Sequence, residues 1–419
     1  MAGTSLDAAE VRRRLSRLST VDEYMAATYP GTTSGRQPVH TCYVPASAVD
    51  VGVLDRWSSE ALAALNEHAP RPEDFVEVLG LDALLAEAVH PRVRAKLRDR
   101  PVEDLRIDFE DGYGSPADEV EDREAKRTAE IVAGWLRDGA EPVCFGLRVK
   151  SFDTPELRAR SVRTLDIFLT ELLQQWGALP AGFQLTFPKV VDAAQVEVFV
   201  EVLELLEQQL GVTEGALRFE IQVETTQSIV DSEGRVALPG FLRAGAGRVS
   251  GLHFGTYDYT ASCGLTAAHQ HLAHRACDFA RHVMQVSAAG TGVFLSDGST
   301  NVLPVGETAQ VHHAWRTHFQ LVLRSLEHGF YQGWDLHPAQ LVTRYAAVFA
   351  AFRESAPAEA KRLSAYVSAS GGAVLDEPAT ARALAASFVR ALDNGATDVD
   401  EVREMTGVSE ARLRELGRL

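Results

Sequence analysis

Eight short runs of β-branched and aromatic residues, separated by longer stretches with helical spacing, constrain the fold of this chain more than any other feature. Strands that alternate with helices favour right-handed βα units and a parallel sheet. Eight parallel strands are also the number that closes a TIM (β/α)8 barrel, so we expect an α/β fold of that kind. The predicted strands are residues 40–45, 105–110, 143–149, 183–188, 217–223, 249–254, 292–295 and 333–337.

The stretches between these strands carry helical signals. Apolar side chains recur on one face of the stretch that ends at Leu210, and again between Ala309 and Leu326. This spacing is typical of amphipathic helices that cover a sheet. Thr154 followed by Pro155 indicates a helix N-cap with a first-turn proline.

Three predicted parts make up the chain. Residues 1–38 form an N-terminal helical arm, and residues 39–350 form the barrel. The barrel includes a mostly helical segment at 51–100 that is longer than an ordinary βα connection. Residues 351–419 are wholly helical apart from a glycine-containing hinge at 368–372.

Composition excludes several classes of protein. The 46% hydrophobic content is enough to bury a core. The 41 Lys and Arg against 58 Asp and Glu give a net charge of −17, which argues against binding to nucleic acid or to an anionic membrane. No apolar run predicts a membrane span or a signal peptide. The four scattered cysteines lack a CxxC pair, so we expect a cytoplasmic protein.

Charged side chains follow six of the eight predicted strands. Active sites of parallel barrels lie at the carboxyl ends of the strands, and packing alone gives a core strand no reason to end in charge. Any one of these residues could be a solvated loop charge, but together they predict a functional site. The residues are Glu110, Asp111, Arg148, Lys150, Lys189, Glu224, Asp258 and His337.

Glu224 and Asp258 follow neighbouring predicted strands and suit a metal ion. No His or Cys lies near either of them in the sequence, so the donors are hard oxygens. Mg²⁺ prefers such ligands and keeps several waters, which a 2-keto acid substrate could replace. Alternatively, one carboxylate could pair with Arg148 or Lys189, but this would not account for two acids together. We predict Mg²⁺, with Mn²⁺ as the alternative ion.

Seven short motifs occur along the chain in a recognisable order. They are Tyr43-Val-Pro45, Asp108-Phe-Glu-Asp111, Leu147-Arg-Val149, Phe187-Pro-Lys189, Val223-Glu-Thr225, Gly255-Thr-Tyr-Asp258 and Gly333-Trp-Asp-Leu-His-Pro-Ala-Gln340. In this order the chain resembles the citrate lyase β-subunit-like proteins of the HpcH/HpaI aldolase and citrate lyase superfamily, from about residue 40 to 390. The resemblance implies a Mg²⁺-dependent TIM barrel that makes or breaks a carbon–carbon bond next to a carboxylate or acyl-CoA carbonyl.

The resemblance also implies roles for individual residues. Glu224 and Asp258 would be the metal ligands, and Arg148 would bind substrate. Tyr43 and Lys189 lie in matched motifs and are expected to contribute to substrate binding. The metal and Arg148 would together stabilise the negative charge of an enolate.

The C-terminal segment is implied to be a lid that reaches the site of a neighbouring subunit. Asp376, within Val374-Leu-Asp-Glu-Pro378, matches the family's lid aspartate and would be the general acid or base. Without the resemblance, Asp376 is equally well explained as a helix N-cap before Pro378. The implied assembly is a homo-oligomer, a trimer or a hexamer.

The sequence departs from the family at two places. Lys150 stands where members often have Asn, so it is a candidate substrate-binding residue of altered polarity. The lysine that acyl-CoA members use a few residues beyond Tyr43 has no counterpart in residues 47–50, which leaves use of a CoA ester open. Residues 247–259 also resemble malate synthase, a related barrel that runs a condensation.

The predicted function is a Mg²⁺-dependent carbon–carbon lyase acting on a small carboxylate or acyl-CoA substrate. Arg148 and Asp376 would be catalytic, and Glu110 and Asp111 would hold a metal-bound water or orient Arg148. A malate synthase-like condensation is the alternative reaction. A catalytically silent metabolite-binding barrel is the alternative class, although it would have no need for all of these groups.

Overall fold

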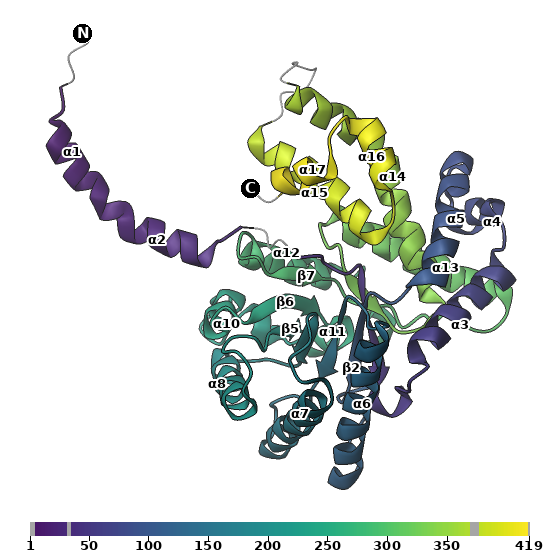
Figure 1. Ribbon diagram of the computed structural model, residues 1–419, viewed down its shortest axis with the longest axis horizontal. Helices are drawn as coiled ribbons and strands as arrows, with labels where there is room; N and C mark the ends of the chain where they lie inside the picture. The colour runs from purple at the N-terminus through teal and green to yellow at the C-terminus, as the bar shows by residue number, and fades with distance from the viewer. Residues whose placement is uncertain (1–4, 32–34, 369–376, 418–419) are drawn as a thin grey trace.

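A single parallel sheet organises the molecule, and the computed structural model describes residues 5–31, 35–368 and 377–417 of the chain (Figure 1). The strand order is β7-β6-β5-β4-β3-β2-β1-β8, and a bridge between Ser296 and Gln332 brings β7 beside β8. The sheet is therefore a nearly closed TIM barrel, which confirms the predicted fold. The strands are β1 His40–Pro45, β2 Asp104–Asp108, β3 Cys144–Arg148, β4 Phe183–Phe187, β5 Phe219–Val223, β6 Val249–Phe254, β7 Phe294–Ser296 and β8 Gly333–Asp335.

All eight predicted strands are confirmed. The bounds of β1 and β6 agree with the prediction, and each of the other six strands differs from it by one or two residues at one or both ends. Each strand hydrogen-bonds to its sequence neighbour, because every connection crosses over through helix and returns to the next position. The carboxyl ends therefore meet at one rim of the barrel.

The helices between the strands form the outer layer. Thr154 caps α7 by accepting a hydrogen bond from the Leu157 backbone N–H at 3.3 Å, as the Thr-Pro pair predicted. The helices are α6 Asp118–Asp138, α7 Pro155–Trp176, α8 Ala193–Leu210, α9 Thr226–Ile229, α10 Leu238–Ala244, α11 Thr256–Ser262, α12 Arg275–Ala288 and α13 Thr308–Glu327, with 3-10 turns η2 Ala46–Ala48 and η3 Ala267–His269. None of the described helices is long and apolar enough to span a membrane.

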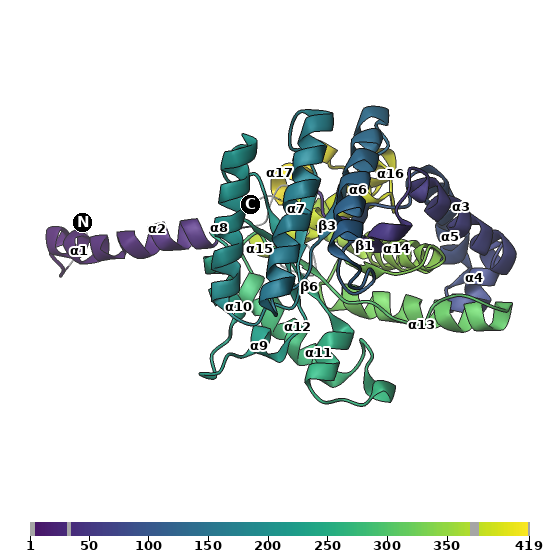
Figure 2. The same ribbon diagram turned by 90° about the horizontal axis from the view of Figure 1, so that it is seen from below.

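Two further groups of helices pack together beside the barrel (Figures 1 and 2). Glu401 joins them, since its carboxylate lies 2.7 Å from Arg92 of α5 and 3.2 Å from Arg353 of α14. The first group is α3 Val53–His68, α4 Pro72–Leu79 and α5 Ala83–Asp99; the second is α14 Gln340–Val367, α15 Pro378–Asn394, α16 Val399–Thr406 and α17 Glu410–Gly417. The division at residue 350 stays a prediction, and the continuous helix α14 runs through it.

The C-terminal helices lie toward the amino ends of the strands. Residues 392–395, at the end of α15, line a cavity of about 490 Å³ with residues 100–103 and 139–143, which precede β2 and β3. The described part of the predicted lid is therefore at the opposite end of the barrel from the carboxyl rim. It does not cover the rim of its own chain.

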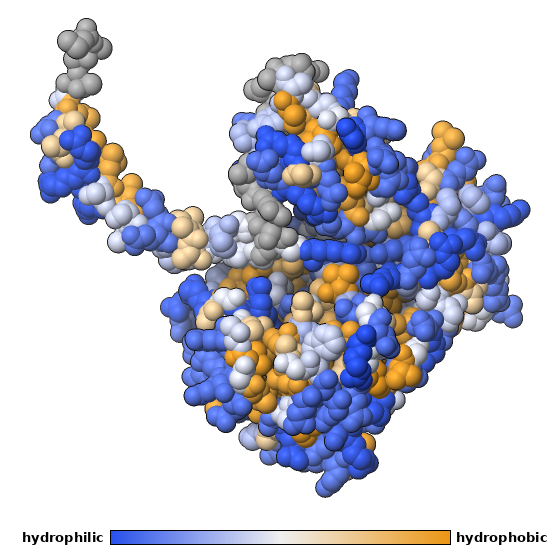
Figure 3. Space-filling view, in the orientation of Figure 1, coloured by the Kyte–Doolittle hydropathy of each residue, from blue (hydrophilic) through white to orange (hydrophobic). Residues whose placement is uncertain are grey.

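The N-terminal arm consists of α1 Ala8–Leu15, the 3-10 turn η1 Ser16–Leu18 and α2 Ser19–Thr28. It projects away from the body, and none of its described residues is buried (Figures 1 and 2). Its base is held by a hydrogen bond from Gly31 N–H to Gly290 O at 2.9 Å. Figure 3 shows apolar residues along one edge of the arm and charged residues along the other.

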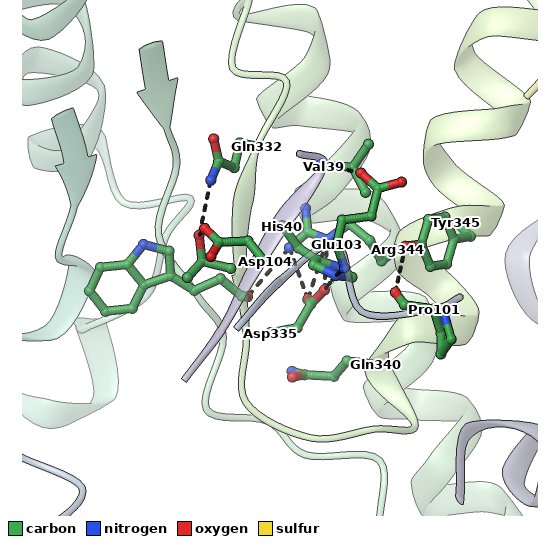
Figure 4. A network of polar contacts seen from close by, with 12 residues as sticks. Val39, His40, Pro101, Glu103, Asp104, Gln332, Asp335, Gln340, Arg344 and Tyr345 are labelled. Atoms are coloured by element: carbon green, nitrogen blue, oxygen red, sulfur yellow. Dashed lines mark hydrogen bonds and ion pairs between the residues drawn. The ribbon is translucent and has the colours of Figure 1, made fainter. Parts of the chain in front are cut away.

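A buried polar network joins β1 and β8 to the outer helices (Figure 4). Asp335 at the end of β8 lies 2.9 Å from Arg344 of α14, 3.0 Å from His40 of β1 and 3.1 Å from His318 of α13. Burial opposes ionisation of Asp335, but Arg344 and the two histidines hold its pKa well below its ordinary value. The charge of Asp335 therefore anchors α13 and α14 where the barrel closes.

The interior of the barrel is also polar. The fully buried Arg106 of β2 lies 2.7 Å from Asp104 and 3.0 Å from Glu220 of β5. Glu220 also lies 3.2 Å from His253 of β6. Burial opposes its charge, but Arg106 and His253 lower the pKa of Glu220 to about 2. A buried cluster of ionisable side chains thus spans the barrel from β2 to β6, where many barrels hold branched aliphatic side chains.

Close strand packing requires glycine at position 146 of β3. A Cβ there would lie 1.7 Å from the Gln184 carbonyl oxygen of β4, which is backbone and cannot rotate away. We expect Gly146→Ala to lower the free energy of unfolding by about 3 kcal/mol or more. Gly134→Ala on α6 meets no atom closer than 4.0 Å and should raise it by about 1 kcal/mol through helix propensity. Urea unfolding of both variants tests the two signs; equal values would contradict the packing.

Candidate functional site

The carboxyl rim of the barrel holds a cluster of acids around one ammonium group. The Nζ of Lys189, after β4, lies 2.6 Å from Glu110 Oε1 and 2.8 Å from Asp111 Oδ2, both after β2. It also lies 3.7 Å from Asp258 Oδ2, after β6. Burial opposes its charge, but Glu224 and the other carboxylates raise the pKa of Lys189 well above its ordinary value. The structure therefore brings together five of the predicted residues.

The backbone at Lys189 is strained. Its φ of 52° lies in the left-handed region, which non-glycine residues seldom adopt. In this conformation the Lys189 N–H donates a 2.9 Å hydrogen bond to Glu224 Oε1. Strain of this kind concentrates at functional sites, where surrounding contacts maintain it. One residue thus contacts Glu224 through its backbone and Glu110, Asp111 and Asp258 through its side chain.

Glu224 is the most deeply buried acid of the cluster, with 1% of its surface exposed. Burial raises its pKa to about 8, and the nearby charges of Asp258 and Glu110 act in the same direction, opposed by Lys189. Gly255 after β6 leaves room for this side chain, since a Cβ there would lie 2.4 Å from both Cβ and Oε2 of Glu224. Glycine at 255 is therefore a packing requirement of the site.

Asp258 lies in the first turn of α11, four residues beyond the end of β6, after the strand that the prediction placed before it. Its side chain is 44% exposed, in contrast with that of Glu224. The pair therefore combines one buried carboxylate and one that faces solvent.

Arg148, at the end of β3, is held by a bidentate ion pair. Its Nε and Nη2 each lie 2.7 Å from an oxygen of Asp108, its neighbour in the register of β2 and β3. The guanidinium also stacks 4.9 Å from the ring centre of Tyr43 on β1. Its Nη1 points toward Glu110, with Oε2 at 3.4 Å. Arg148 is thus oriented on one side and directed toward the acid cluster on the other.

Glu110 connects the guanidinium and the ammonium. Burial raises its pKa to about 7, while Arg148 and Lys189 oppose that rise. For Asp111, burial opposes ionisation, but the hydrogen bonds with Glu110 and Lys189 bring its pKa below the ordinary value. Two adjacent carboxyls thus have separated pKa values, and Glu110 can exchange a proton near neutral pH.

Lys150 and His337 do not contact this cluster. The Lys150 ammonium donates to the carbonyls of Phe109 at 2.8 Å and Gly114 at 2.6 Å, so it holds the loop that carries Glu110. His337 accepts a hydrogen bond from the Ala339 N–H through Nδ1 at 3.2 Å. The predicted substrate contact of Lys150 stays a prediction, and its present contacts are structural.

Asp376, the predicted general acid or base, lies outside the described residues. Its predicted role and its predicted delivery to a neighbouring subunit stay predictions.

The donor set suits a hard cation that is completed by water or substrate. Within residues 5–31, 35–368 and 377–417, no three His, Cys, Asp or Glu side chains form a ready metal cage. Two carboxylates with several waters are, however, a common way for proteins to hold Mg²⁺. Burial raises the pKa of Glu224, and Asp258 and Glu110 add to the rise, so a divalent cation bound beside it would favour the ionised form. Glu224 and Asp258 therefore fit such an ion.

A family model for a domain of unknown function, DUF6986, matches residues 18–419. The chain belongs to the DUF6986 family. No curated protein matches the sequence of this DUF6986 protein.

Solved structures similar to this DUF6986 protein include a citrate lyase from Burkholderia xenovorans. That chain is 18% identical, has a TM-score of 0.55, and the match covers 89% of this chain and 99% of the other. A malate synthase from Haloferax volcanii is 15% identical with a TM-score of 0.48, covering 91% and 99%. An HpcH/HpaI aldolase/citrate lyase family protein from Burkholderia cenocepacia is 13% identical with a TM-score of 0.40, covering 74% and 92%. The resemblance carried by the motifs is confirmed, and at this identity it establishes the fold.

Two residues that shape the site had no predicted role. Asp108 fixes Arg148, and Gly255 makes room for Glu224. Both lie inside matched motifs, but their partners are on neighbouring strands. The register of β2 with β3 and of β5 with β6 is needed to see these pairs.

The raised pKa of Glu224 predicts how stability depends on pH in metal-free protein. Glu224 titrates near 8 when folded and near 4.5 in the unfolded chain, so the folded state binds more protons between those values. Stability should therefore fall as pH rises from about 4.5 to 8. Glu224→Gln should remove up to about 1.4 kcal/mol per pH unit of that slope. Urea unfolding with a chelator from pH 5 to 9 measures this.

Glu119→Gln, at an exposed position on α6, is the matched control. It should leave the slope unchanged. If the free energy of unfolding of Glu224→Gln depends on pH as steeply as that of the wild-type protein, the pKa assigned to Glu224 is wrong.

Proposed function

We propose that this protein is a carbon–carbon lyase that acts on a small carboxylate through an enolate. The observation that carries the proposal is the rim cluster, in which Arg148 and Lys189 converge with a buried and an exposed carboxylate. Enolate chemistry needs positive charge placed in advance where negative charge develops. The TIM-barrel fold shared with a citrate lyase supports the same reaction class.

Glu224 and Asp258 would hold Mg²⁺, or Mn²⁺ in its place. When bound, the ion would supply Lewis-acid stabilisation of a substrate oxygen. Lys189 lies against both acids in the structure, through its N–H and its Nζ. It would keep Glu224 oriented and partly neutralise the cluster when a divalent ion is absent.

Arg148 would bind the substrate carboxylate and stabilise the enolate oxygen. Asp108 takes up Nε and Nη2, so Nη1 remains to face the cluster. Because the guanidinium is held before substrate arrives, it loses little freedom in the reaction. The ring face of Tyr43 stacks against the guanidinium and helps to keep it in this orientation.

Glu110 would hold and release a proton at Oε2. Its pKa of about 7 allows both forms near neutral pH, which general acid–base catalysis requires. Lys189 and Arg148 on either side stabilise the ionised form after the proton leaves. Asp376 remains the proposed partner from a neighbouring chain in a homo-oligomer.

Activity assays test the reaction class. Purified protein with Mg²⁺ should cleave a 4-hydroxy-2-keto acid or a malyl- or citramalyl-CoA ester. Arg148→Ala should lower the rate by about 10²–10³-fold, the usual cost of losing one preorganised donor. Arg163→Ala, an exposed arginine paired with Asp122, is the matched control and should leave the rate unchanged. Thermal melting would verify that both variants are folded.

Near-full turnover by a folded Arg148→Ala variant would remove Arg148 from the mechanism. Condensation of acetyl-CoA with glyoxylate in place of cleavage would instead identify a synthase. Absence of both reactions with all substrates would contradict an enzymatic role in this reaction class.

Melting temperature in the presence of Mg²⁺ tests the metal site separately. Mg²⁺ at 100 times its Kd should stabilise the wild-type protein by about 2.7 kcal/mol. Glu224→Gln and Asp258→Asn should each abolish most of the effect, because each removes one of two carboxylate ligands. Glu119→Gln serves again as the control. A wild-type melting temperature that neither Mg²⁺ nor Mn²⁺ changes would exclude these ions from the site.

A further inference from the structure

The N-terminal arm is helical and meets the body only at its base, within the described residues, where residues 24–30 line a cavity of about 400 Å³ with residues of α10 and β6. Residues 5–31 contain no buried side chain, yet they include several large apolar residues. The helices α1 and α2 have eight and ten residues, and isolated helices of that length are marginal in water. Figures 1 and 2 both show the arm directed away from the body. A stable arm therefore needs a partner outside the chain.

The apolar stripe of the arm is symmetric about Leu18. Its members are Val11, Leu15, Leu18, Val21 and Met25, spaced four, three, three and four residues apart. Leu15 is 59% exposed, Leu18 53%, Val21 49% and Met25 47%. Reversing the direction of the helix leaves this pattern unchanged, so the stripe is complementary to an antiparallel copy of itself.

Two pairs of opposite charges in the arm follow the same symmetry, whereas Asp7, Glu10, Arg12 and Arg17 have no charged counterpart across Leu18. Basic residues, among them Arg13 and Arg14, precede Leu18, and the acids Asp22 and Glu23 follow it. Arg14 and Asp22 lie four residues on either side of Leu18, and Arg13 and Glu23 lie five. The side chains of Arg13 and Arg14 are 74% and 72% exposed although both pair with Glu10, and within the described chain Asp22 and Glu23 have no ion pair. An antiparallel partner would bring opposite charges together at both ends.

We propose that the arms of two copies of this chain pair antiparallel about a twofold axis at Leu18. Leu15 would face Val21 of the second copy, and Val11 would face Met25 of the second copy. Arg14 would pair with Asp22 of the second copy, and Arg13 with Glu23 of the second copy. Such an isologous contact is satisfied by two copies. It doubles the mass of any assembly that the rest of the chain, residues 35–417, forms without the arm.

Contacts at the base of the arm hold it away from the body, so that its apolar stripe is accessible to a second copy. Gly31 N–H bonds Gly290 O, and the Tyr29 ring lies 3.5 Å from the position that a Cβ of Gly290 would take. These contacts direct the arm outward. The charge pattern favours a second arm over other surfaces, because the stripe and both sets of charges match in a single register.

The pairing is tested by the mass of the assembly that the full-length protein forms. This mass is measured by light scattering or sedimentation across a dilution series. Leu18→Glu places two carboxylates at the twofold axis and should raise the Kd of arm pairing at least about a hundredfold, halving the mass. Leu84→Glu, at a position on α5 that is 77% exposed, is the matched control and should leave the mass unchanged.

Charge reversal tests the register. Arg14→Glu alone and Asp22→Arg alone should each raise the Kd about tenfold, because each turns two symmetric attractions into repulsions. The double variant Arg14→Glu/Asp22→Arg restores both pairs and should return the Kd to the wild-type value. Rescue of this kind is expected only when residues 14 and 22 meet across the axis.

Three results would overturn the proposal. The first is a wild-type mass equal to that of Leu18→Glu. The second is a failure of the double variant to restore pairing. The third is loss of pairing in Glu354→Arg, which would indicate docking in the apolar groove of about 450 Å³ between α13, α14 and α15, lined by Glu354.

Discussion

The parallel closure of eight strands is the constraint on which the candidate site depends. Because every strand runs in the same direction, residues separated by up to 148 positions, from Glu110 to Asp258, end at one rim. Burial at this rim raises the pKa values of Glu110 and Glu224, and the neighbouring carboxylates add to the rise. Lys189 and Arg148 oppose it. The balance between burial and these two cations determines what chemistry the rim can support.

Ion pairs position the cations at successive depths of the barrel. Arg106 lies deepest, between Asp104 and Glu220, and holds these two carboxylates in the interior beneath the rim. Arg148 lies above it, fixed by Asp108. Outside the barrel, Asp335 anchors the helices that surround its closure. Buried charges of this kind contribute little net stability, but each sets the orientation of a neighbouring group.

Much of the architecture could be predicted because its signals are local. Strand composition and helical spacing identified all eight strands, and the charges that follow them identified Glu110, Asp111, Arg148, Lys189, Glu224 and Asp258 as members of one rim. Lys150 shows the limit of this reasoning. It follows a strand as the others do, yet its ammonium is occupied by the carbonyls of Phe109 and Gly114. The direction of a side chain after a strand depends on loop geometry, which no local pattern specifies.

By itself, the sequence determined the number, order and common direction of the strands, the charges at their ends and the symmetric pattern of the arm. These properties follow from spacing along the chain and from the two periodicities of helix and strand. Only the tertiary structure decided that Asp108 orients Arg148, that Gly255 admits Glu224 and that Lys189 adopts a positive φ to contact four acids. The reason is physical: such contacts depend on the register between strands and on the shape of neighbouring loops, and both are set by packing across the whole barrel.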